Sequence, residues 1–228
     1  MTTIVPTSAA ASIKKRRHID VPGIGGYAAR YVAAHLDKEA GALVDSWLAT
    51  SAGGTLAKVG TTATLMTVGD DGEYFLTSPG GQSTGGRVLG PHTTQRPFTI
   101  AAVVKASAGT LAFMGMTGIT LARTAGGFWA QVAGGSATQT STSSNAGWAL
   151  VFMNAHADGT HSLTVDGVTT AKGAAGTAVT SFGGFYFGSG TAGQTAHLRE
   201  AVIWHSDLSA DERAKVNAYF KSRYAGLK

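Results

Sequence analysis

The feature that most constrains the fold is a series of short apolar or β-branched runs that recur about every ten residues, with glycine-containing turns between nearly all of them. Glycine supplies 32 of the 228 residues, roughly twice its ordinary share. In the run Phe98–Lys105, alternate residues from Phe98 to Val104 are apolar and share one face, which is typical of a strand. The other expected strands are Thr110–Met114, Gly118–Arg123, Phe128–Val132, Ala137–Thr142, Trp148–Asn154, His161–Val165, Phe182–Gly188 and Leu198–His205. This spacing predicts an all-β sandwich or barrel and excludes a helical bundle.

Three local segments add detail to this pattern: a hairpin turn, a C-terminal helix and an ambiguous stretch near the N-terminus. Asp166-Gly167 between two valines predicts a two-residue hairpin of type I′, because both residues tolerate positive φ. Ser209 followed by Glu212 forms a capping box, and apolar residues then recur at helical spacing, so we expect a helix over about Ala210 to Tyr224. The stretch Ala28 to Leu36 is compatible with a strand or a short helical turn.

The charge distribution separates an arm from a body. The chain carries 18 Lys plus Arg against 13 Asp plus Glu, a formal charge of +5. Four of the positive charges, Lys14, Lys15, Arg16 and Arg17, lie in one tetrad, and five more lie in the C-terminal helix and tail. The remainder is close to neutral, which argues against a nucleic-acid-binding face. We expect residues 1–26 to form an extended arm that orders by contact with a partner, and residues 27–228 to form one domain, including the helix over 210–224.

Several protein classes are excluded by what the sequence lacks. It has no cysteine, so disulfides and thiolate metal sites are absent. It has no run of about 18 apolar residues, so we expect no membrane span. The N-terminal segment carries its positive charges after its apolar part, the reverse of a signal peptide, and we expect no export by a cleaved signal.

Several segments, in order, resemble the laminin-G-like, concanavalin A-like jelly-roll domains. They are Ala42–Trp47 with Gly53–Leu56, Pro97–Lys105, Trp148–Val151 with Asp158–Thr160 and Leu163–Gly167, Phe187–Gly188, and Glu200–Trp204 with Leu208–Arg213. Val103 stands where a tryptophan is common in these domains. The resemblance covers about Tyr27 to Tyr224.

The resemblance implies a two-sheet antiparallel jelly-roll sandwich with one C-terminal helix. It also implies a non-enzymatic structural component of a bacteriophage virion, as a capsid-decoration, tail or fibre protein that the tetrad Lys14–Arg17 attaches to other virion proteins. Such proteins are made in the host cytoplasm and are often homo-oligomers. The alternative is a glycan-binding adhesion module. Calcium occurs in some relatives, but the sequence offers no clustered acids for it, and we expect no cofactor.

Catalytic motifs receive little support from the sequence. Gly81–Gly85 matches the G-x-S-x-G nucleophile elbow in letters, but lacks the strand before the serine and the helix after it. Glycosidase relatives place two carboxylates on one strand, whereas the glutamates here are scattered. We therefore expect no enzymatic activity.

The remaining candidate residues are aromatic or metal-ligating. His156, Asp158 and His161 flank one expected hairpin loop and could ligate a metal, but an ordinary Asp-Gly turn gives the same pattern, and we predict no metal site. Trp129 could stack against a sugar, although a packing role is the alternative. Trp47, Trp148 and Trp204 fall in motifs that are usually core. Asp70-Asp71 before Gly72 is expected to form a turn.

Overall fold

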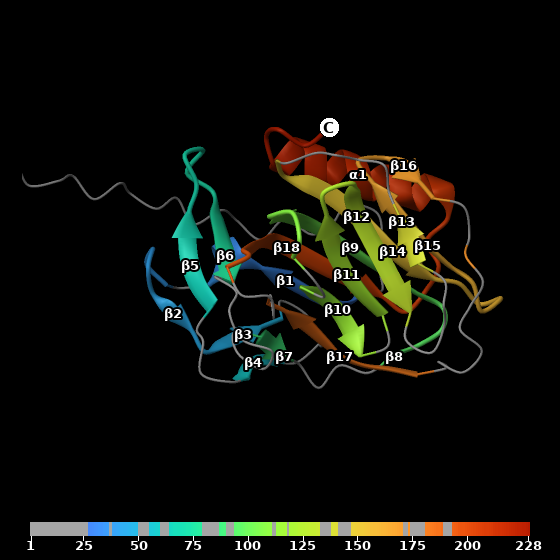
Figure 1. Ribbon diagram of the computed structural model, residues 1–228, viewed down its shortest axis with the longest axis horizontal. Coiled ribbons are helices and arrows are strands. Elements are labelled where there is room, and N and C mark those ends of the chain that lie inside the picture. The colour runs from blue at the N-terminus through green and yellow to red at the C-terminus, as the bar shows by residue number, and fades with distance from the viewer. Residues whose placement is uncertain are drawn as a thin grey trace, which may run out of the picture.

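The computed structural model describes most of the chain after residue 26. The described residues are 27–36, 38–49, 55–59, 64–78, 87–89, 94–110, 113–117, 119–132, 138–140, 147–170, 173, 181–188 and 193–228. They form two nine-stranded antiparallel sheets packed face to face, with one α-helix, α1 (Ala210–Arg223), along the outside of one sheet (Figure 1). Within this part of the chain, no helix is both long and apolar enough to cross a membrane.

The first sheet carries the helix. Its strands are β1 (Tyr27–Val32), β2 (Leu43–Val44), β5 (Thr64–Val68), β6 (Tyr74–Ser78), β9 (Phe98–Ala106), β14 (Ala149–Ala155), β15 (His161–Val165), β16 (Val168–Thr169) and β18 (Ala196–Trp204). Their order is β16-β15-β14-β9-β18-β6-β5-β2, and β1 also pairs with β18. A 3₁₀ turn, η1 (Ala33–His35), follows β1.

The second sheet closes the other side of the core. Its strands are β3 (Ser46–Leu48), β4 (Thr55–Val59), β7 (Arg87–Leu89), β8 (Thr94–Gln95), β10 (Met114–Thr117), β11 (Ile119–Thr124), β12 (Gly127–Val132), β13 (Thr138–Thr140) and β17 (Ser181–Phe187). Their order is β13-β12-β11-β10-β17-β7-β4-β3, with β8 paired to β17.

Strand β9 lies at the centre of the first sheet and is buried on both faces. Ile100 and Val104 belong to the main core between the sheets, whereas Ala101 and Val103 belong to a second apolar cluster on the outer face, beneath α1. The helix contributes Val216 and Phe220 to that second cluster. Because both faces of the strand are buried, its sequence is almost continuously apolar, with the residues of the two faces alternating along it.

A β-bulge in β18 places two charged residues on the outer face. Leu198 pairs with Val104 and Glu200 pairs with Val103, so Arg199 is the extra residue of the bulged strand. Both Arg199 and Glu200 contact Tyr224, the C-cap residue of α1, which shows that their side chains lie on the same side of the sheet.

Glu200 is the centre of a buried polar network that joins β1, β18 and α1. Its carboxylate accepts hydrogen bonds from Arg30 Nε at 2.7 Å and from the Tyr224 hydroxyl at 2.7 Å, and Arg223 Nε lies 3.2 Å away. Arg30 also donates to the Tyr219 hydroxyl. Burial, followed by the nearby Glu200 carboxylate, raises the pKa of Tyr219 to about 12. Burial, followed by the Glu200 carboxylate, also raises the pKa of Tyr224, so both tyrosines remain neutral at physiological pH.

The structure confirms the all-β two-sheet fold, the helix with its capping box, and the type I′ character of the hairpin, where Asp166 and Gly167 both have positive φ. The stretch Ala28 to Leu36 proves to be a strand followed by a 3₁₀ turn. Of the strand expected over Thr110–Met114, residues 111–112 lie outside the described residues, Thr110 belongs to a turn in which its hydroxyl donates to the Ser107 carbonyl, and the observed strand β10 begins at Met114. The sequence does not predict strands β2 to β8, which are only two to five residues long.

We predict that Glu200→Gln destabilises the fold. A neutral amide leaves two buried guanidinium groups without their carboxylate, and breaking a buried pair in this way costs about 3 to 5 kcal/mol of unfolding free energy. Urea unfolding of the variant measures the change. Glu39→Gln, which removes an exposed carboxylate, should change the unfolding free energy by less than about 0.5 kcal/mol. Equal effects of the two substitutions would contradict a structural role for the network.

Candidate ligand-binding site

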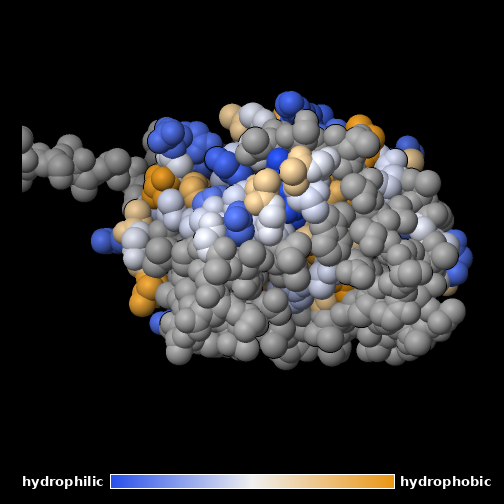
Figure 2. Space-filling model, viewed as in Figure 1, coloured by the Kyte–Doolittle hydropathy of each residue, from blue (hydrophilic) through white to orange (hydrophobic). Residues whose placement is uncertain are grey.

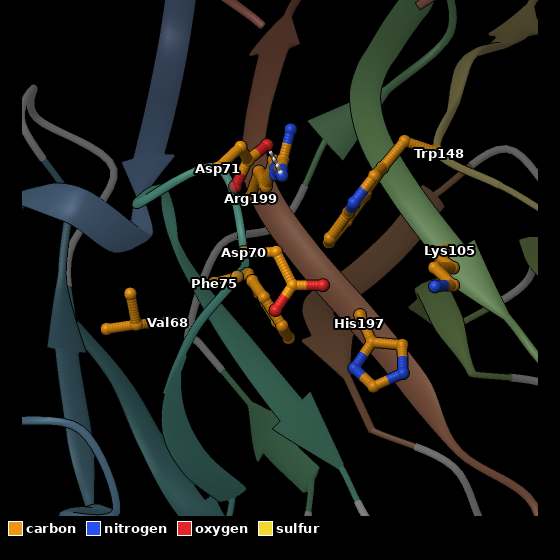
Figure 3. Close-up of a pocket in the computed structure, with 9 residues that line it drawn as sticks. Val68, Asp70, Asp71, Phe75, Lys105, Trp148, His197 and Arg199 are labelled. Carbon is orange, nitrogen blue, oxygen red and sulfur yellow. Dashed lines mark hydrogen bonds and ion pairs between the residues drawn. The ribbon is translucent and has the colours of Figure 1, made fainter. Parts of the chain in front are cut away.

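A pocket opens on the outer face of the first sheet, beside the C-terminal end of α1. Its volume is about 400 Å³, and it lies between the β5–β6 turn and the neighbouring ends of β9, β14 and β18 (Figure 3). The residues that line it are Val68, Gly69, Asp70, Asp71, Phe75, Lys105, Trp148, His197 and Arg199. Strand alternation explains why several of them meet, since Lys105 and His197 face each other in the β9–β18 register and both lie outward from the core.

Three aromatic rings in mutual contact form one wall of the pocket. Phe75 lies edge-to-face against Trp148 at 5.1 Å between ring centroids and against His197 at 5.3 Å, and the Trp148 and His197 rings are 6.2 Å apart. All three side chains are half-buried. Such edge-to-face contacts fix the rings relative to one another and leave apolar surface facing the cavity.

Arg199 supports this wall from beneath. Its guanidinium carbon lies 4.1 Å from the centroid of the Trp148 ring and 5.5 Å from that of Tyr224, which gives two cation–π contacts. Its Nη2 donates to the Asp71 carboxylate at 2.5 Å, whereas Nε and Nη1 are buried and have no hydrogen-bond partner. The guanidinium therefore ties Trp148 to the β5–β6 turn through one ion pair.

The β5–β6 turn presents two adjacent carboxylates with different surroundings. Asp71 accepts a hydrogen bond from the Glu73 amide and pairs with Arg199. Burial alone would raise the pKa of Asp71, but the Glu73 amide and Arg199 together lower it. Asp70 is exposed and points from the turn toward the pocket (Figure 3). Among the described residues it has no hydrogen-bond or ion-pair partner.

His197, one of the three rings of the aromatic wall, is held by a chain of hydroxyl groups. The Thr67 and Thr77 hydroxyls are 2.8 Å apart, and the Thr77 hydroxyl lies 3.0 Å from His197 Nδ1. Burial, and secondly the nearby Lys105 ammonium, lower the pKa of His197 to about 4. The imidazole is therefore neutral at physiological pH.

The structure leaves most of the sequence-predicted site residues untested. Lys14, Lys15, Arg16 and Arg17 lie outside the described residues, as does the G-x-S-x-G stretch of residues 81–85. Trp129 lies in β12, where its backbone pairs with Ala122 and Thr140, and its side chain is likewise outside the described part.

The structure does not bring His156, Asp158 and His161 together as a set of metal ligands. Among the described residues, no group of three metal-ligating side chains is close enough to hold an ion. His156 instead lies 2.5 Å from Asp207 Oδ2 through Nδ1 and 2.9 Å from the Ser162 hydroxyl through Nε2. This order matches a catalytic triad, but Ser162 is only 3% exposed and bonds to Asn154, so the array holds the segment before α1 against the sheet.

Most residues of the pocket are not predicted as site residues from the sequence. Trp47 and Trp204 are buried, as predicted. Trp148 packs against the cluster beneath the helix, as predicted, but it also lines the pocket. The Asp70-Asp71 turn was expected, and it was the one sequence signal that marked this site.

We predict that His197 makes the stability of the protein depend on pH. The unfolded chain binds a proton at this residue near pH 6.5 and the folded protein only near pH 4, so the unfolding free energy falls as the pH drops from 6.5 to 4. Unfolding followed by circular dichroism across this range measures the slope. His197→Gln should flatten the curve. Equal slopes for the wild type and His197→Gln would contradict the prediction.

Comparison with known proteins identifies the fold. No family model matches the chain, and no curated protein matches it. Solved structures do match it. The binding domain of botulinum neurotoxin serotype D aligns with a TM-score of 0.62 and 11% identity, over 85% of this chain and 51% of the neurotoxin domain.

Two further neurotoxin structures bear on ligands. The binding domain of botulinum neurotoxin DC, in complex with SialylT, aligns with a TM-score of 0.61 and 13% identity, over 88% of this chain and 52% of that one. The structure of botulinum neurotoxin type C, whose cell entry depends on two ganglioside molecules, aligns with a TM-score of 0.57 and 14% identity. The alignment covers 79% of this chain and 51% of that one. This chain thus spans about half the length of the binding domains it matches. At these identities the likeness establishes the fold alone, an antiparallel β-sandwich that is similar to part of the neurotoxin binding domains.

Proposed function

We propose that this domain is a non-enzymatic glycan-binding module and that the pocket beside α1 holds the sugar. The observation that carries this proposal is the aromatic wall of Phe75, Trp148 and His197, which faces polar groups around the same cavity. A sugar ring has an apolar C–H face and a rim of hydroxyl groups. A pocket that offers aromatic surface on one side and hydrogen-bonding groups on the others complements both.

The polar groups of the pocket match the needs of hydroxyl groups. Asp70 accepts hydrogen bonds, Lys105 donates them, and the Nε2 atom of neutral His197 does one or the other. A volume of about 400 Å³ lies within the range of small-molecule sites and accommodates one or two sugar units. Figure 2 shows hydrophilic and hydrophobic residues side by side at the β5–β6 end, so the surroundings of the pocket are mixed.

The structural neighbours support a binding role over a catalytic one. They are binding domains, and among them are one solved with SialylT, one solved with rat synaptotagmin II, and one from a toxin whose cell entry depends on gangliosides. Because the chain matches about half of each, we carry ligand binding to it as a proposal that rests on its own pocket.

We predict that Trp148→Ala weakens glycan binding by tenfold or more. The substitution removes the largest ring of the wall, and truncation of an aromatic anchor in a binding site commonly costs at least about 1.4 kcal/mol. A glycan array with the full chain identifies the ligand, and calorimetry gives the Kd. Lys105→Ala, at an exposed position away from the core, tests the same pocket without loss of packing and should also weaken binding.

Trp129→Ala serves as the control for the other sugar-stacking candidate. If the pocket is the site, this variant keeps the wild-type Kd. Loss of binding with Trp129→Ala and retention with both Trp148→Ala and Lys105→Ala would move the site to β12. The absence of saturable binding to any glycan would contradict the proposed function.

The virion role expected from the sequence stays a prediction. It concerns residues 1–17, which the structure does not describe, and the neurotoxin neighbours do not bear on it. A display role on a phage particle is compatible with glycan binding. Co-sedimentation of the full chain with assembled particles, and its loss on deletion of residues 1–17, would support a virion role and attachment through the tetrad Lys14–Arg17.

A further inference from the structure

The charges that line the pocket are balanced, and they fall into two pairs with different roles. Asp70 and Asp71 are negative, and Lys105 and Arg199 are positive. No third cation is present at neutral pH, because burial and the Lys105 ammonium keep His197 neutral. The pocket therefore has no net charge to be neutralised by a ligand.

One of the two pairs is already committed to the protein. Arg199 is 1% exposed, is packed between Trp148 and Tyr224, and binds Asp71 at 2.5 Å. Its Nε and Nη1 atoms are buried as well. A ligand in the pocket meets the Trp148 ring that Arg199 supports, and a ligand anion gains little from a charge that Asp71 has already compensated.

The other pair remains available to a ligand. Asp70 extends from the β5–β6 turn and Lys105 from the end of β9, and they point into the pocket from opposite sides (Figure 3). Neither has an ion-pair partner among the described residues. A ligand between them therefore meets a carboxylate on one side, an ammonium on the other, and the aromatic wall along its length.

We propose that the pocket selects a neutral sugar unit with adjacent hydroxyl groups and discriminates against sugars that carry a carboxylate. This inference rests on the proposed function and names its ligand class. Two neighbouring hydroxyls donate to the two oxygens of Asp70, while Lys105 donates to a hydroxyl or ring oxygen on the opposite side. Asp70 is the specificity-determining residue.

An acidic sugar fits this arrangement less well. A carboxylate in a cavity of this size lies within a few ångströms of Asp70, and like charges at such distances repel with a strength that grows as water is displaced. Lys105 attracts the same carboxylate, but a carboxylate gives up far more hydration than a hydroxyl on entering the pocket, and pairing with Lys105 leaves it facing the like charge of Asp70. The net effect is a preference for the neutral unit.

The test compares matched neutral and acidic ligands by calorimetry with the full chain. One arm sets oligogalactosides against oligogalacturonates, and the other sets lactose against sialyllactose, so that uronic and nonulosonic acids are distinguished. We expect the neutral member of at least one pair to bind about tenfold more tightly than its acidic partner. We also expect the Kd of the neutral sugar to be nearly independent of salt between about 50 and 300 mM. Added salt screens ionic contacts, so a neutral ligand should be little affected by it.

Asp70→Asn identifies the residue responsible. The amide keeps the shape of the side chain and removes its charge, so this variant should bind the neutral sugar more weakly and lose most of its discrimination. Glu39→Gln, which removes a carboxylate that does not line the pocket, should retain both the affinity and the discrimination.

The outcomes separate the two proposals. If the wild type binds no sugar in the full array, the proposed function fails. If it binds acidic sugars as tightly as or more tightly than their neutral partners, the glycan-binding role stands and the inference about ligand class is overturned. If Asp70→Asn keeps the full discrimination, the assignment of specificity to Asp70 is overturned.

Discussion

The bulge in β18 is the feature on which both the fold and the pocket depend. In a regular strand, Arg199 and Glu200 would point to opposite faces, and one charge would enter the core between the sheets. The extra residue places both on the outer face. Glu200 then joins β1 and α1 through a buried network, while Arg199 supports Trp148 and binds the β5–β6 turn. The same irregularity fastens the helix and builds one wall of the pocket.

The sequence predicts those parts of the fold that arise from local rules. The alternation in Phe98–Lys105, the positive φ values of Asp166-Gly167, and the capping box of Ser209 and Glu212 each need only neighbouring residues, and the structure contains all three. The position of the bulge cannot be predicted from the sequence of β18 alone, because it depends on how β18 pairs with β9. Strands β2 to β8 are two to five residues long, too short to show a clear alternation of apolar and polar residues.

The pocket illustrates the same limit for function. Its residues come from the β5–β6 turn, the end of β9, the residue before β14, and the start of β18, so no sequence spacing brings them together. In contrast, His156 with Asp207 and Ser162 has the order of a catalytic triad, yet it is enclosed and holds a loop in place. Residue types alone therefore fail to predict a site that is present and also suggest a site that is not accessible. Burial and access to solvent decide which polar cluster can meet a ligand.

The hydroxyl chain behind His197 allows the imidazole to be either a hydrogen-bond donor or a hydrogen-bond acceptor toward the pocket. Either threonine can be the donor between Thr67 and Thr77, and the imidazole has two neutral tautomers. When the chain of protons points toward the ring, Nδ1 accepts and Nε2 donates. When the chain reverses, Nδ1 donates and Nε2 accepts. His197 can therefore meet either a hydrogen-bond donor or a hydrogen-bond acceptor of a ligand without moving its ring.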